Sequence, residues 1–197
     1  MVSPFLFFPG ERLALTELSA ACLDGVLVPL GEGFIPADAV ETAWMRARSL
    51  APLLGQRWAA VRTSAAWVHG GMPAEPSRHH LQRAGMARVR AHHTARAAYH
   101  DVRLPAADTT ALAGVHLSTP GRTLADLARS GDERERAVAS SWAASDPEAR
   151  AQAGAWLARH PRFPYGQRGV LLLSQVEDAA SHGTDSPSPE MPTATTT

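Results

Sequence analysis

Hydrophobic and polar residues alternate most clearly between residues 114 and 129, where the pattern predicts a strand that leads into a helix. Val115 and Leu117 alternate with polar neighbours, which is typical of a half-buried strand. Thr119 and Pro120 then provide a capping hydroxyl and a residue that is well tolerated in the first helical turn. We therefore expect a helix to begin near Pro120.

The predicted helix carries an apolar stripe formed by Leu124, Leu127 and Ala128, which recur at helical spacing. This stripe should pack back on the sheet. The polar residues on the opposite side, which we expect to face solvent, are Arg122, Asp126 and Arg129.

Residues 13–39 predict a short helix followed by a β-hairpin. Leu18 and Cys22 lie on one side of the helix, Gly25 follows its end, and Gly31-Glu32-Gly33 forms the turn between two apolar segments. A helix and a hairpin are the second half of a winged helix, whose earlier helices normally carry the one that enters the DNA groove. We expect a truncated or remodelled winged-helix-like module over residues 1–39.

Residues 40–130 predict a mixed β-sheet with packed helices. Apolar spacing indicates helices over 39–54 and 58–69, with Gly70-Gly71 ending the second and Trp67 in the core. The predicted strands are 78–83, 97–104 and 112–117. The fold class that follows is α+β.

The C-terminal part predicts helices alone. The expected helices span 132–144, 147–159 and 165–180, and Asp146-Pro147 provides a cap and a first-turn proline for the second. Ser, Thr and Pro dominate residues 181–197, which predicts a disordered tail. Residues 131–180 are therefore expected to form a helical segment that follows the α/β domain.

Composition indicates a cytoplasmic protein. Cys22 is the single cysteine, which fits a reducing compartment, and no apolar run approaches the ~18 residues of a membrane span. The N-terminus lacks the basic region of a signal peptide. We expect no membrane partner.

Positive charge concentrates in the middle of the chain. All 19 Lys+Arg residues are arginine, and residues 51–107 hold eight of them against two acidic residues, whereas the segments on either side are each net negative. The candidate residues for contact with nucleic-acid phosphates are Arg78, Arg83, Arg88 and Arg90. A partner protein with an acidic patch would also fit this strip, with the tryptophan-bearing C-terminal helices docking on that partner.

No catalytic or metal site is indicated by the spacing of reactive residues. His79-His80 and His92-His93 are adjacent pairs, and neighbours on a strand point to opposite faces, so neither pair can place both rings on one ion. Ser64 and Ser118 lie outside a Gly-x-Ser-x-Gly motif, and Cys22 lies among alanine and leucine. We expect a non-enzymatic protein without a cofactor, while the clustered histidines leave an unrecognised enzyme as a further alternative.

The order of elements resembles actinobacterial proteins related to the AbiEi-type antitoxins of type IV toxin–antitoxin systems. The segments that carry the resemblance are ELSAACLDGVLVPLGEGFIPAD (17–38), TSAAWVHGG (63–71), RHHLQRA (78–84) and GVHLSTPGRTLADLAR (114–129). The resemblance spans roughly residues 13–130. The N-terminal module is short and acidic, whereas a DNA-binding module of that family should be basic.

The resemblance implies a DNA-binding transcriptional regulator or antitoxin that represses its own operon. Its partners would be its own operator DNA and a nucleotidyltransferase-type toxin. Some relatives carry a nuclease-like domain that needs a Glu-x-Lys element, which this lysine-free chain lacks. The resemblance therefore implies regulation rather than DNA cleavage.

Overall fold

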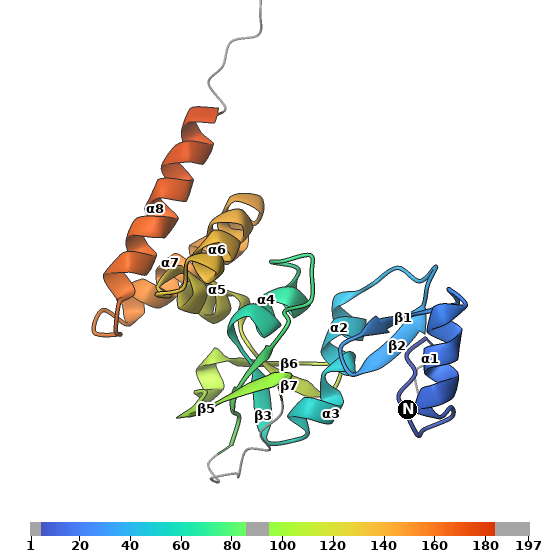
Figure 1. Cartoon of the computed structure of the whole chain (residues 1–197). Helices are drawn as coiled ribbons and strands as arrows, with labels where there is room; N and C mark the ends of the chain where they lie inside the picture. Colours follow the sequence, from blue (N-terminus) through green and yellow to red (C-terminus); the bar gives the residue numbers. More distant parts are fainter. Residues whose placement is uncertain (1–4, 86–94, 184–197) are drawn as a thin grey trace, which may run out of the picture.

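The chain has an α+β fold built from three regions that follow one another along the molecule. The computed structural model describes residues 5–85 and 95–183. An N-terminal unit lies at one end, a five-stranded sheet lies in the middle, and a layer of helices ending in α8 lies at the other end (Figure 1).

The N-terminal unit is a helix followed by a hairpin, as the sequence predicts. It consists of α1 (Leu15–Leu23), β1 (Leu27–Leu30) and β2 (Gly33–Pro36), and Phe7 forms an antiparallel bridge with Phe34 of β2. Gly31 at the turn has a φ of 57° and lies against Ser49, where a Cβ atom would overlap the serine side chain. Within the described residues, α1 is the one helix that precedes the hairpin.

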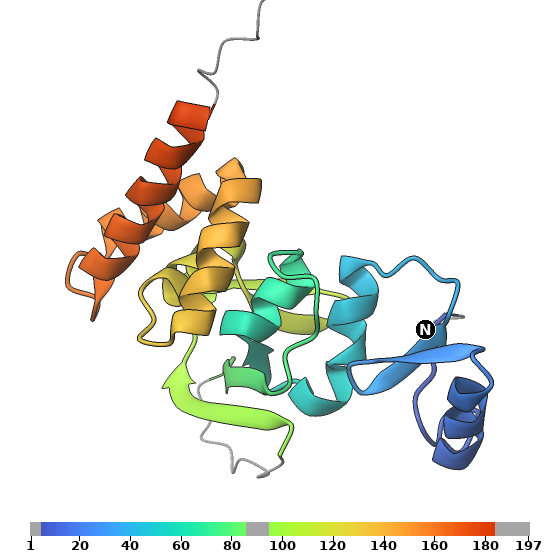
Figure 2. The same ribbon diagram turned by 45° about the horizontal axis from the view of Figure 1, so that its top comes forward.

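The central sheet is mixed and has the order β5-β4-β3-β7-β6. Its strands are β3 (Trp58–Ala60), β4 (His79–Arg83), β5 (Ala97–Arg103), β6 (Thr109–Leu112) and β7 (Val115–Ser118). The pairs β4–β5 and β3–β7 are parallel, and the pairs β3–β4 and β6–β7 are antiparallel. Helices α2 (Ala43–Ser49), α3 (Ala51–Leu54) and α4 (Arg62–His69) pack beside the strands (Figure 2).

Three predicted elements were wrong in detail. Residues 39–54 form two helices rather than one, with Pro52 in the first turn of the second. Residues 58–69 form β3 and then α4, and the chain turns between them at Arg62, which has a φ of 52°. The strand expected over 112–117 is a hairpin, in which β6 and β7 flank Ala113 and Gly114 with φ of 53° and 79°.

One hydrophobic core joins the N-terminal unit to the sheet. Leu6 and Ile35 of the N-terminal unit share this core with Trp58, Trp67 and Leu117. Trp67 is 1% exposed, so its expected role in the core is confirmed. The hairpin is therefore packed on the sheet through apolar side chains.

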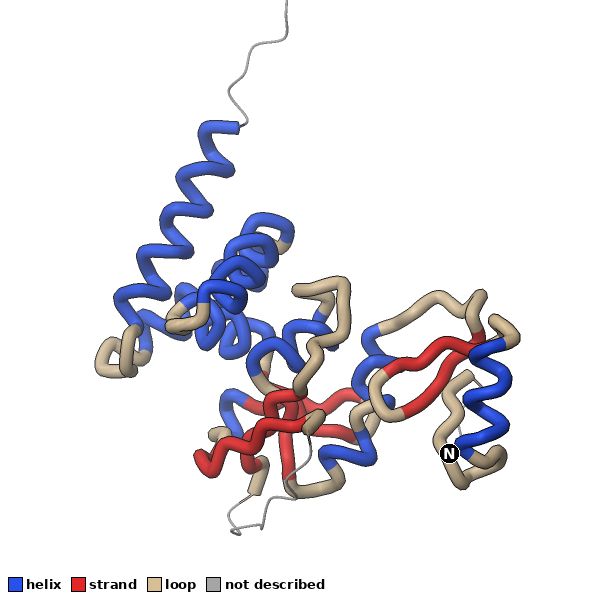
Figure 3. Tube along the Cα trace, in the orientation of Figure 1, coloured by secondary structure: helices blue, strands red, loops and turns tan. Residues whose placement is uncertain are grey.

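The helical layer begins where the sequence predicts. Its helices are α5 (Pro120–Ala128), α6 (Glu133–Ser145), α7 (Pro147–Arg159) and α8 (Gly166–Gly183), drawn in blue in Figure 3. Side chains of Thr119, Asp132 and Asp146 accept hydrogen bonds from the first turns of α5, α6 and α7. The last helix runs to Gly183, past the predicted end at 180, and residues 184–197 of the expected tail lie outside the described residues.

The polar side of α5 is buried, contrary to the expectation from its periodicity. Arg122 and Asp126 are each 5% exposed, and every residue from Gly121 to Ala128 is buried. The reason is that α5 packs against α4 on one side and against α6, α7 and α8 on others, so little of its surface is left for solvent. No helix in the described ranges is long and apolar enough to cross a membrane.

Candidate functional site

The sequence-predicted arginines do not form one strip. Arg78 precedes β4 and donates to the carbonyl of Ala97, whereas Arg83 ends the same strand. A strand rises about 3.3 Å per residue, so the two arginines are about 16 Å apart along β4. Arg88 and Arg90 lie outside the described residues.

Arg83 instead lies beside two arginines that the sequence analysis did not select. The N–H of Ala84 donates to the carbonyl of Arg57 at 2.9 Å, and Arg83 is the register partner of Arg103 on β5. The backbones of Arg57, Arg83 and Arg103 therefore lie at one end of the sheet, across about 10 Å, with the side chain of Arg57 on the opposite face from that of Arg83. The strand order β3-β4-β5 was the missing information, because these residues are far apart in sequence.

The charges at this end of the sheet are mostly uncompensated. Arg83 forms an ion pair with Asp101, with 2.8 Å between Nε and Oδ1, and its side chain is 14% exposed. Arg57 and Arg103 are exposed, and neither forms an ion pair with a carboxylate of the described residues. We call Arg57, Arg83 and Arg103 the arginine edge.

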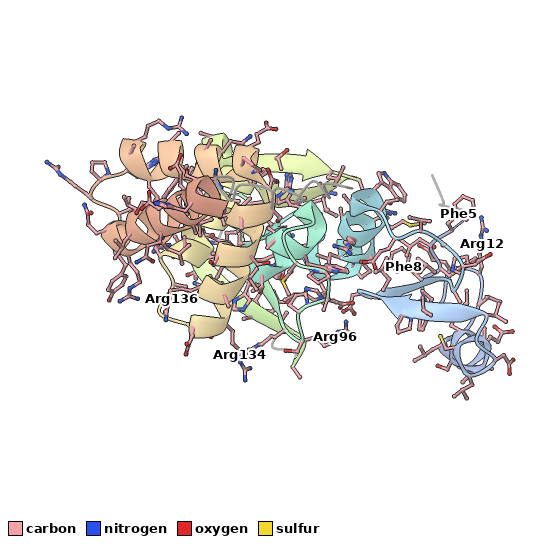
Figure 4. All side chains as sticks on the ribbon, turned by 90° about the horizontal axis from the view of Figure 1, so that it is seen from above. Phe5, Phe8, Arg12, Arg96, Arg134 and Arg136 are labelled. Atoms are coloured by element: carbon pink, nitrogen blue, oxygen red, sulfur yellow. The ribbon has the colours of Figure 1, made fainter. Side chains whose placement is uncertain are left out.

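Other arginines of the basic middle are paired internally. Arg96, labelled in Figure 4, contacts carboxylate oxygens of Glu32 and Glu75 at 3.0 Å each. Arg62 forms a bidentate pair with Glu135 and also donates to Ser130. Arg62 and Arg96 are therefore engaged in ion pairs, whereas Arg57, Arg78 and Arg103 are exposed and form no ion pair with a carboxylate of the described residues.

His79 connects a buried serine to a glutamate. Its Nδ1 lies 3.2 Å from Ser64 Oγ, and its Nε2 lies 3.0 Å from an oxygen of Glu75. Ser64 and His79 are 0% and 1% exposed, so a substrate cannot reach the hydroxyl in this conformation. Glu75 also accepts from the N–H of Gly31, so the chain of contacts fastens the hairpin turn to the sheet.

The carboxyl group of Glu75 has a lowered pKa. Burial alone would raise this pKa, but the hydrogen bonds from His79 and from the N–H of Gly31 outweigh burial. Arg96 acts in the same direction. The group is therefore held as a carboxylate at the junction between the hairpin and the sheet.

His80 points to the opposite face of the sheet from His79, as the strand geometry predicts. Its Nδ1 lies 3.1 Å from Nε2 of His100, and the two rings stack with 5.4 Å between centroids. Burial, reinforced by the charge of Arg62, lowers the pKa of His80 to about 4 and also lowers the pKa of His100. The pair is therefore neutral near pH 7, and His92 and His93 lie outside the described residues.

The lowered pKa values predict a loss of stability in mild acid. In the unfolded chain, His80 takes up a proton near pH 6.5, whereas in the folded protein its pKa is about 4. The contribution of His80 to the free energy of unfolding is therefore fully present above pH 6.5 and is lost as the pH falls toward 4. Thermal unfolding followed between pH 7.5 and 4 measures this. The variant His80→Gln should show a shallower decline, and a profile identical to that of the wild type would contradict the assignment.

Sequence reasoning missed a buried ion network centred on Arg122. Arg122 donates to Asp108 at 2.7 Å and to Asp126 at 2.8 Å. Asp108 also accepts from the indole N–H of Trp156 at 2.8 Å, and the guanidinium of Arg122 lies 4.6 Å from the centre of that ring. Asp108 follows β5 in the short helix η1 (Ala106–Asp108), so the network fastens the connection between β5 and β6 to α5 and α7.

The structure also tests where the C-terminal tryptophans lie. Trp142 and Trp156 are 2% and 3% exposed and belong to the core of the helical layer. Their rings are covered by the protein itself, so a partner that docks on the C-terminal helices would contact other residues of these helices. Among the described residues, no group of three or more histidine, cysteine or acidic side chains is arranged to hold a metal ion.

Comparison with models of known protein families found no match, and comparison with curated proteins found no similar sequence.

Proposed function

We propose that the protein is a cytoplasmic, non-enzymatic DNA-binding regulator of the kind that the AbiEi-type resemblance implies. The observation that supports this is the arginine edge, where three strand segments bring Arg57, Arg83 and Arg103 together with one paired carboxylate. Arginines spaced over about 10 Å can contact successive phosphates of one DNA strand.

The N-terminal unit does not supply the main DNA contact in this proposal. Its helix α1 carries Glu17, which accepts from the N–H of Ala14, and two large apolar side chains that face solvent, Leu15 at 57% and Leu23 at 89% exposure. A surface of this kind lacks the cations that phosphate binding requires. DNA would therefore be bound through the sheet region.

Binding to the DNA upstream of the protein's own coding region tests the proposal. The protein should retard a labelled fragment of that DNA in a gel-shift assay at ~50 mM salt, where phosphate contacts are strongest. Absence of a shift at this salt concentration would contradict the proposal. An adjacent nucleotidyltransferase-type toxin gene would support the regulatory context.

A protein-interaction module without nucleic-acid binding is the second candidate. It is favoured by the exposed apolar residues of α1 together with Val26, which is 61% exposed next to them in sequence. A toxin protein would be the partner under the same resemblance. Purification from the native host with one stoichiometric protein and no nucleic acid would favour this candidate, and Leu23→Asp should then release the partner.

A further inference from the structure

A small cavity lies between the sheet and the loop that follows α7. It has a volume of about 250 Å³, and its lining includes Arg62, Gln82, His100, Arg122, Arg129 and Phe163. A water molecule occupies about 30 Å³ in the liquid, so the space suits one small group with a few waters. The arginine edge does not include any of these residues.

Gln82 is a buried polar side chain that faces this cavity without a partner. It is 7% exposed, and its amide forms no hydrogen bond with any residue in the described ranges. The amide atoms of Gln82 keep access to the open space of the cavity, so they are available to hydrogen-bond a ligand there.

The other polar groups of the lining offer mainly N–H donors. Arg62 uses Nε and Nη2 for Glu135 and Ser130, and Arg122 uses Nε and Nη1 for its two aspartates, which leaves one terminal nitrogen of each arginine without a hydrogen bond to the described residues. His100 uses Nε2 for His80, which leaves its Nδ1.

The lining contains a single carboxylate, and it is already engaged. Asp126 accepts from Arg122 through one oxygen and from Arg129 through the other. Glu135 forms an ion pair with Arg62, and Asp108 forms one with Arg122. Neither carboxylate is part of the cavity lining. The cavity therefore presents the donor edges of three arginines and few acceptors, which suits an acceptor-rich anion.

We propose that this cavity binds an oxyanion, the phosphate or carboxylate group of a small molecule, through Gln82, His100 and the free N–H groups of Arg62 and Arg122. The volume excludes a larger ligand from entering completely, so the anionic group is the part recognised. Arg129, which also donates to the carbonyl of Pro164, positions the loop that closes the site on one side.

Thermal unfolding in sodium phosphate, in sodium acetate and in sodium chloride of equal ionic strength tests the site. Phosphate or acetate at ten times its dissociation constant should raise the unfolding temperature by about 3–5 °C relative to chloride. The same anion should shift the NMR signals of the His100 ring. A response to phosphate alone or to acetate alone identifies the group, and no response to either at 20 mM would overturn the proposal.

The matched variants are Gln82→Met and Arg134→Gln. Methionine has a similar shape without the amide, so Gln82→Met should fold at least as well as the wild type and bind the anion at least tenfold more weakly. Arg134 is exposed on α6 and is labelled in Figure 4, and Arg134→Gln should leave the anion response unchanged. An equal response in Gln82→Met and the wild type would contradict the site even if phosphate stabilises the protein.

Discussion

Replacing Arg122 with methionine is expected to lower the free energy of unfolding by about 3–5 kcal/mol, because Asp108 and Asp126 then stay buried without their cation. Both carboxylates contact Arg122 within 2.8 Å, and all three side chains are less than 10% exposed. Urea denaturation followed by circular dichroism gives the free energy. A solvent-exposed ion pair between an arginine and carboxylates should not show the same loss of unfolding free energy.

Arg96→Met is the matched control for this prediction. Arg96 also contacts two carboxylates, those of Glu32 and Glu75, but its side chain is 53% exposed. Exposed ion pairs contribute little, so this variant should lose less than about 1 kcal/mol. Equal losses in the two variants would mean that burial does not set the strength of the Arg122 network.

Gly121→Ala should destabilise the protein by about 1–3 kcal/mol, although alanine is the better helix former. A Cβ atom at Gly121 would lie 2.8 Å from Cβ and 2.9 Å from the backbone carbonyl carbon of Gln152, so α5 and α7 would have to separate. The matched variant is Gly154→Ala on α7, where a Cβ atom meets nothing within 4 Å.

The two glycine variants should change stability in opposite directions. Gly154→Ala should gain up to about 1 kcal/mol through helix propensity alone. Thermal unfolding of both variants measures the difference. If Gly121→Ala were as stable as Gly154→Ala, the close approach of α5 and α7 would be wrong.

Local signals in the sequence were sufficient for the helix starts and for the fold class. Thr119 and Asp146 cap the helices that they were expected to cap, because an N-cap depends on residues within one turn. The turn at Arg62 could not be predicted, since a non-glycine residue with positive φ has no sequence signal. The turn between β6 and β7 was missed because its first residue is Ala113, which seldom adopts that conformation.

Burial of the polar side of α5 depends on tertiary packing that periodicity does not contain. A stripe of Leu124, Leu127 and Ala128 predicts one buried face, but α5 is surrounded by other helices, so its second face is buried as well. The partners of Arg122 come from positions 108 and 126, and only the second lies at helical spacing. The network therefore became visible only with the fold.

The candidate interface was predicted in part. The sequence analysis predicted Arg83 as a phosphate-contacting residue because it lies in the basic middle of the chain. The strand order places Arg57 and Arg103 on the neighbouring segments. Arg78 lies at the other end of β4, which a linear count of charge cannot reveal.

The salt dependence of DNA binding tests the central proposal most directly. A plot of the logarithm of the association constant against the logarithm of salt concentration has a slope of about −0.9 for each phosphate contact. The double variant Arg57→Ala/Arg103→Ala should reduce the magnitude of that slope by about 2, whereas Arg134→Ala/Arg162→Ala, which removes the same charge from exposed positions of the helical layer, should leave it as in the wild type. Equal slopes for the wild type and the Arg57/Arg103 variant would contradict the assignment of the arginine edge as the DNA-binding surface.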